Sequence, residues 1–95
     1  MTAVTATNDQ EWVNDWTPAY AEALARAEGL ELTPEHWKLI NFVREDAIAT
    51  GKTPGLRRVS KETGTGMKDI YRLFPKAPGK RIAQLAGVPK PKSCL

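Results

Sequence analysis

Apolar residues recur at helical spacing over most of the chain, most clearly in its centre. Between Pro34 and Gly51, apolar side chains return every three or four positions, the spacing of one buried helix face. Thr33 is suited to cap this helix, and Pro34 takes the first helical position, where proline costs no hydrogen bond. Gly51 ends the pattern. The residues expected on its buried face are Trp37, Leu39, Ile40, Phe42, Val43, Ala47 and Ile48.

Four further helices are predicted from the same periodicity and from the prolines and glycines between them. The first begins after a cap at Thr17, has Pro18 at its first position and ends near Glu28, before Gly29. The others are expected at 53–63, starting at Thr53-Pro54, at 67–74 and at 80–86. Pro75, Pro78 and Gly79 break the pattern between the last two, and Gly87 stops the final helix.

The chain is expected to form one mainly α domain, a small orthogonal helical bundle over residues 1–87. Its 95 residues suffice for one modest core. Residues 1–11 are expected to be poorly ordered, although Val4 and Trp12-Val13 allow a short N-terminal β-hairpin. Residues 88–95 contain Pro89 and Pro91, which exclude a helix, so this segment is predicted to be an extended, largely exposed C-terminal arm.

Charge is divided unevenly between the two halves of the chain. Residues 1–50 hold three basic and nine acidic residues, whereas residues 51–95 hold eleven basic and two acidic ones. The local net charges are therefore −6 and +9. Two interpretations remain open: the basic half meets an anionic partner, or the halves attract each other within the fold.

Several classes of protein are disfavoured by composition. No apolar run approaches the roughly 18 residues that span a membrane, and the N-terminus lacks the pattern of a secretory signal. A single cysteine cannot form an internal disulfide, and with a single histidine it makes a protein-only zinc site improbable. We therefore expect a cytoplasmic protein with no membrane association, no metal and no cofactor.

The lone thiol of Cys94 is the main candidate for chemistry. It follows the Pro-Lys-Pro-Lys stretch and is the penultimate residue, so we expect it to be exposed. The positive charges of Lys90 and Lys92 favour the nucleophilic thiolate, although solvent screens them. An extended arm of about seven residues from Gly87 reaches roughly 20 Å, at ~3.1 Å per residue. Such an arm suits transfer of a persulfide sulfur between proteins, by the logic of thiol–disulfide exchange.

Several segments resemble the DsrC/TusE family. Tyr71–Lys80, Ala86–Pro91 and the penultimate Cys94 resemble its C-terminal signature, and Leu32–Trp37 and Phe42–Arg44 resemble the segment at its central helix. The match covers roughly residues 12–95. The resemblance implies a sulfur-relay protein, a sulfurtransferase in the sense of a persulfide carrier, whose partners are protein donors and acceptors of sulfur.

The resemblance also distinguishes two branches. The TusE branch takes sulfur from a TusBCD-type complex and passes it towards a tRNA 2-thiouridine synthase. The DsrC branch serves dissimilatory sulfite reductase and has a second cysteine eleven residues before the penultimate one. Ala83 occupies that position here, and one thiol cannot form an intramolecular disulfide. The TusE-like interpretation is favoured, and the alternative is a DsrC-like partner, a gamma subunit, of sulfite reductase or related sulfur metabolism.

Four more cations are candidates for electrostatic assistance or docking, on the strength of charge and of the matched signature. They are Arg72, Lys76, Lys80 and Arg81.

A different class of function is a helix-turn-helix DNA-binding regulator, because 55–74 can be read as two short helices joined by a glycine-containing turn. The basic side chains that could contact DNA phosphates are those of Arg57, Arg58, Lys61, Lys68 and Arg72. A surface near tRNA, or near an acidic protein, explains the charge at least as well.

The remaining polar and aromatic residues have simpler interpretations. His36 is expected to pack or cap a helix, Glu45-Asp46 to be solvated, and Trp12, Trp16 and Trp37 to belong to the core.

Overall fold

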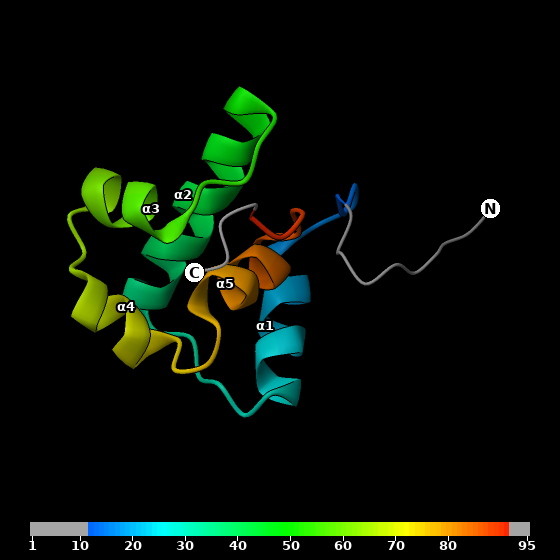
Figure 1. Cartoon of the computed structure of the whole chain (residues 1–95). Coiled ribbons are helices and arrows are strands. Elements are labelled where there is room, and N and C mark those ends of the chain that lie inside the picture. The colour runs from blue at the N-terminus through cyan, green and yellow to red at the C-terminus, as the bar shows by residue number, and fades with distance from the viewer. Residues whose placement is uncertain (1–11, 92–95) are drawn as a thin grey trace.

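Five helices follow one another in the part of the chain that this computed structural model describes, residues 12–91 (Figure 1). They are α1 (Pro18–Ala27), α2 (Pro34–Thr50), α3 (Leu56–Thr63), α4 (Met67–Leu73) and α5 (Pro78–Ala86). Helix α5 packs against α1 and α2, and α3 packs against α2 and α4. In Figure 1, α3 and α4 lie on one side of α2, and α1 lies on the other. The prediction of a mainly α bundle is confirmed.

The predicted helix ends are confirmed where a cap could be recognised. Thr17 accepts a hydrogen bond from the Tyr20 N–H at 3.2 Å, and Pro18 is the first residue of α1. Gly51 closes α2 in the left-handed conformation, with φ of 81°. These caps form from residues adjacent in the sequence, which is why the sequence alone places them.

Two helix starts were predicted wrongly. Helix α3 begins at Leu56 with Gly55 as its cap, not at Thr53-Pro54, because the Thr53 side chain bonds to another segment. Helix α5 begins at Pro78, two residues before the predicted start. Pro78 opens the helix instead of breaking it, since proline is tolerated in the first turn.

All five helices contribute to one core. Its buried apolar residues are Ala21, Ala25, Leu39, Ile40, Val43, Ala47, Leu56, Val59, Ile70, Leu73, Phe74, Ile82, Ala83, Leu85, Ala86 and Val88. Trp16 and Trp37 are half-buried against it. Ile48 is 60% exposed and Trp12 is 40% exposed, so neither joins the core as predicted.

The tentative N-terminal hairpin finds no support. Trp12 and Val13 are not part of a strand, and residues 12–91 contain none. Val4 and the rest of residues 1–11 lie outside the described residues. Within the described chain, no helix is both long enough and apolar enough to cross a membrane.

Candidate functional site

The chain reverses sharply where α5 ends, at the base of the predicted arm. Gly87 adopts the left-handed conformation, with φ of 72° and ψ of 32°. Its N–H donates to the Gln84 carbonyl at 3.2 Å, and the Val88 N–H donates to the Ala83 carbonyl at 3.1 Å. This pair of bonds is the Schellman pattern, and it turns the chain back along the helix.

The carbonyls that find no hydrogen-bond partner within this turn accept hydrogen bonds from distant parts of the chain. Trp16 Nε1 donates to the Leu85 carbonyl at 2.7 Å, and Arg44 Nη1 donates to the Ala86 carbonyl at 2.9 Å. The Val13 N–H donates to the Gly87 carbonyl at 2.9 Å. The last carbonyls of a helix have no partner within it, so these bonds complete its C-terminal end.

A fourth donor lies further along the tail. Thr53 Oγ1 donates to the Pro89 carbonyl at 2.6 Å. Together Val13, Trp16, Arg44 and Thr53 hold consecutive parts of 85–89, and we refer to these four residues as the C-terminal clamp. They come from the segment before α1, from α2 and from the connection between α2 and α3.

Packing within the clamp is tight. The Arg44 guanidinium carbon lies 4.6 Å from the centroid of the Trp16 ring, in a cation–π arrangement. A methyl group added at Gly87 would lie 2.6 Å from Trp16 Cδ1 and 3.2 Å from Arg44 Nη1. Position 87 therefore requires glycine twice, for its positive φ and for its lack of a side chain.

The first half of the predicted arm packs on the body. Val88 is fully buried and Pro91 is buried, whereas Lys90 is exposed. This differs from the expectation of a largely exposed tail from residue 88 onwards, because the clamp and the apolar contacts of Val88 hold it. Cys94 and Lys92, the predicted nucleophile and one assisting lysine, lie outside the described residues.

The structure does not gather the other four candidate cations around this base. Arg81 bonds to Glu28 at 2.9 Å, and Arg72 contacts Asp69 at 3.4 Å and Glu35 at 3.8 Å. The hydrogen bond and then the charge of Arg81 lower the pKa of the Glu28 carboxyl. Arg81 lies in the first half of α5 and Arg72 lies on α4, whereas the tail leaves from the C-terminal end of α5.

Lys76 and Lys80 are exposed, and neither forms an ion pair with another residue of 12–91. Lys76 and Arg81 line a small hollow of about 230 Å³, whose other lining residues are Glu28, Leu30 and Pro75. Of the assisting residues predicted from the sequence, Lys76 and Arg81 are therefore brought together. They lie beside Glu28, whose carboxylate already forms an ion pair with Arg81.

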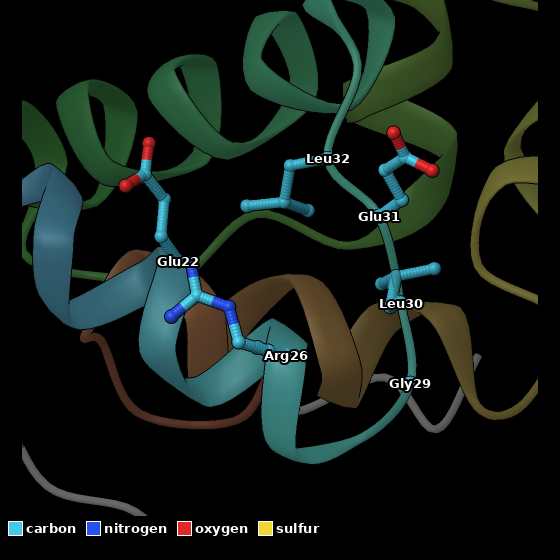
Figure 2. A pocket seen from close by; sticks show the side chains of 6 residues that line it. All are labelled: Glu22, Arg26, Gly29, Leu30, Glu31 and Leu32. Atoms are coloured by element: carbon cyan, nitrogen blue, oxygen red, sulfur yellow. The ribbon is translucent and has the colours of Figure 1, made fainter.

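A larger open hollow, of about 470 Å³, lies beside α1. Figure 2 shows Glu22 and Arg26 projecting from α1, while Leu30, Glu31 and Leu32 follow on the connection to α2. No candidate site residue lines it. Among residues 12–91, no three side chains of the metal-ligating types come close enough to hold a metal ion.

Part of the charge asymmetry is neutralised within the fold. Three ion pairs join the acidic half to the basic half, namely Arg58–Asp46, Arg72–Glu35 and Arg81–Glu28. Asp46 receives Arg58 Nε at 3.0 Å and Nη2 at 2.7 Å, and its side chain is only 10% exposed. The prediction that Asp46 is simply solvated is thus wrong. The guanidinium bonds lower the pKa of the Asp46 carboxyl.

His36 has a structural place, as predicted. It is 6% exposed and lies edge-on to Phe74. Its Nδ1 accepts from the Thr33 N–H at 3.0 Å, so Nε2 carries the proton that binds the Leu73 carbonyl at 2.9 Å. Both ring nitrogens are used in joining the start of α2 to the end of α4.

Helices α3 and α4 with the turn 64–66 do form a helical hairpin. Of its five candidate phosphate-binding cations, Arg58 and Arg72 are engaged by carboxylates, as described above. The others are Arg57, Lys61 and Lys68, and all three are exposed.

Sequence reasoning missed the clamp. Trp16 was assigned to the core, Thr53 to a helix start, and Arg44 was noted only within a matched segment. Gly87 was the one signal, since a helix-ending glycine predicts a reversal of the chain, but it does not say which distant donors meet it.

Comparison with known proteins gives a consistent result. The model of the family described as "DsrC like protein" matches residues 4–95. The gamma subunit of dissimilatory-type sulfite reductase from Nitratidesulfovibrio vulgaris is 39% identical, over 86% of this chain and 79% of that protein. Sulfurtransferase TusE of Salmonella typhimurium is also 39% identical, over 84% of this chain and 80% of TusE.

Solved structures agree with this fold. The NMR structure of Allochromatium vinosum DsrC is similar with a TM-score of 0.78 and 39% identity, over 87% of this chain and 80% of that one. The oxidised gamma subunit of Archaeoglobus fulgidus dissimilatory sulfite reductase has a TM-score of 0.74 and 32% identity, over 95% of this chain and 91% of that one. None of these matches supports the DNA-binding alternative.

Proposed function

Because this chain belongs to the DsrC-like family, we propose that it is a sulfur-relay protein whose Cys94 accepts a persulfide sulfur and passes it on. The observation that carries the proposal is the sole thiol of the chain at its penultimate position, in a family that includes sulfurtransferases. The described helical body supplies the surface on which donor and acceptor proteins dock.

The chemistry needs no cofactor and no external oxidant. The Cys94 thiolate attacks the outer sulfur of a donor persulfide, the donor's sulfur–sulfur bond breaks, and the donor leaves as a thiolate. An acceptor thiolate then attacks the outer sulfur of the Cys94 persulfide and releases Cys94 as a thiolate. Lys90 and Lys92 favour the anionic sulfur by their charge, whereas Arg72 and Arg81 are already used by carboxylates.

The single thiol separates the two branches of the family. Ala83 stands eleven residues before Cys94 and is fully buried within α5. With no second cysteine, sulfur cannot be bridged between two thiols of this chain. This favours a TusE-like carrier in the cytoplasm, between a TusBCD-type donor and a tRNA thiolation enzyme. The similarity to a sulfite reductase gamma subunit supports the second candidate, a partner of a sulfite-reductase-like complex.

Loading of sulfur tests the chemistry. The full chain is incubated with glutathione persulfide and its intact mass is measured. The wild type should gain one sulfur atom, and Cys94→Ser should gain none. Equal gain in both proteins, or gain in neither, would overturn the proposal.

The pathway needs a separate test. The chain is expressed in Escherichia coli lacking its TusE, which is 35% identical to this chain, and tRNA 2-thiouridine is measured by mass spectrometry. Restoration by the wild type but not by Cys94→Ser supports the tRNA branch. If a chain that takes up sulfur in the first test does not restore tRNA 2-thiouridine, the sulfite-reductase candidate takes precedence.

A further inference from the structure

We infer that the C-terminal clamp positions the thiol: the side chains of Trp16, Arg44 and Thr53, three of its four residues, fix the place and direction in which the chain leaves the body towards Cys94. The inference rests on the proposed function and adds to it. None of the three is assigned a chemical step. They act through the backbone of 85–89, so they are positioning residues.

The bonds of the clamp exceed what a surface turn requires. Trp16, Arg44 and Thr53 bind the carbonyls of Leu85, Ala86 and Pro89 at 2.7, 2.9 and 2.6 Å. Water would satisfy these carbonyls equally well if the tail only had to end somewhere at the surface. Donors from three separate segments instead hold one backbone path.

The clamp also resists displacement. Arg44 lies between the Trp16 ring and the Ala86 carbonyl, and its positive charge faces the negative end of the α5 dipole. The Trp16 ring closes the space beside Gly87, where an added methyl would lie 2.6 Å from Cδ1. A shift of the tail must therefore break several contacts together.

Chain length gives the consequence for Cys94. From Gly87 the thiol-bearing residue is seven positions away, a reach of roughly 20 Å at ~3.1 Å per residue. From the packed Pro91 it is three positions away, a reach of roughly 10 Å at ~3.3 Å per residue. Halving the reach reduces the volume within reach of the thiol about eightfold, and raises its effective concentration beside a docked partner by the same factor.

The sole cysteine allows a direct test by paramagnetic NMR. A nitroxide is attached to Cys94 of the full chain, and the relaxation enhancement of the backbone amides of 12–91 is measured. In the wild type the enhancement should be strong near the clamp, at the amides within 53–56, of which Pro54 has none. It should be weak at 29–32, the connection at the other end of the molecule (Figure 1).

Two variants and a matched control make the test specific. Trp16→Phe combined with Thr53→Val removes two clamp hydrogen bonds. Phe keeps an aromatic ring at position 16, but a smaller one, so Thr53→Val alone serves if the pair destabilises the fold. Thr63→Val is the control, because Thr63 Oγ1 makes a bond of the same kind, 2.7 Å to the Val59 carbonyl, away from the tail.

In the double variant the enhancement at 53–56 should fall by up to about eightfold and spread to other amides. The single Thr53→Val should show part of that fall, and Thr63→Val should match the wild type. Hydrogen exchange at the Val88 amide should accelerate in the clamp variants while the Ile70 amide stays protected, which a general loss of stability would not produce.

An unchanged pattern of enhancement in the clamp variants would overturn the positioning role, as would a wild-type pattern spread evenly over the body. Failure of the proposed function is a separate result, seen when the unlabelled wild type takes up no sulfur from glutathione persulfide. If the wild type takes up sulfur and the enhancement does not respond to the clamp variants, the positioning role alone is wrong.

Discussion

Trp16 Nε1 lies 2.7 Å from the Leu85 carbonyl oxygen, and this hydrogen bond joins residues 69 positions apart. It connects the entry to α1 with the exit from α5. The two ends of the described chain therefore meet at one place, where Gly87 turns the backbone. The segment that leads to Cys94 starts from there.

The contact between Trp16 and Gly87 predicts unequal effects of two glycine substitutions. Gly64 and Gly87 have nearly the same φ, 74° and 72°, but a methyl at Gly64 meets nothing within 4 Å. Gly64→Ala should cost about 1 kcal/mol for the left-handed conformation alone. Gly87→Ala should cost about 2–4 kcal/mol, because the clash with Trp16 is added.

Urea denaturation of both variants measures the difference in the free energy of unfolding. Equal losses of the free energy of unfolding would show that the Trp16 ring can move aside without destabilising the fold. That result would weaken the case for a rigid clamp.

The helices could be predicted because their signals are local. Thr17-Pro18, Gly51 and the spacing of Ile40, Val43 and Ala47 act within a few residues. Pro78 was misread because a proline looks the same whether it ends one helix or opens the next, and only the packing of α5 decides.

His36 should matter for stability and not for sulfur chemistry. His36→Ala removes the partners of the Thr33 N–H and of the Leu73 carbonyl, the latter in the core. An unsatisfied buried group costs about 1–3 kcal/mol, so the free energy of unfolding should fall by at least that much.

Lys38→Ala, on the exposed side of the same helix, is the control and should change stability by less than about 0.5 kcal/mol. Thermal denaturation compares the two variants. If His36→Ala is as stable as the control, the histidine bonds contribute nothing net.

Acid should weaken the fold partly through Asp46. Its pKa is lowered in the folded protein by the hydrogen bond and charge of Arg58. A carboxyl with a depressed folded pKa adds stability above its unfolded pKa, about 4, and that stability is lost as the pH falls through the folded value.

Melting temperatures of the wild type and of Asp46→Asn, measured from pH 7 downwards, check this. Asp46→Asn should be less stable than the wild type at pH 7, and the gap should narrow below about pH 4. Glu45→Gln is the control, because Glu45 is exposed and forms no ion pair within the described chain. Its melting temperature should equal that of the wild type at every pH. A constant gap for Asp46→Asn would contradict the assignment.

The candidate site was predictable only in its chemistry. A lone penultimate cysteine and its lysines can be read from the sequence, but Trp16, Arg44 and Thr53 cannot be assigned to the tail without the fold. Hydrogen bonds over 69, 42 and 36 positions leave no local pattern. The ion pairs of Arg81 with Glu28 and of Arg72 with Glu35 could not be predicted for the same reason, whereas Asp69, the other partner of Arg72, is only three positions away.

The central claim is that Cys94 holds sulfur transiently, and intact mass followed through loading and release tests it most directly. The chain is loaded with isotopically labelled glutathione persulfide, freed of reagent, and then mixed with an acceptor thiol. The account predicts a gain of one labelled sulfur on Cys94, its appearance on the acceptor, and return of the chain to its starting mass, ready for a second cycle. A chain that never gains the label at Cys94, or gains it and never releases it, would contradict the account.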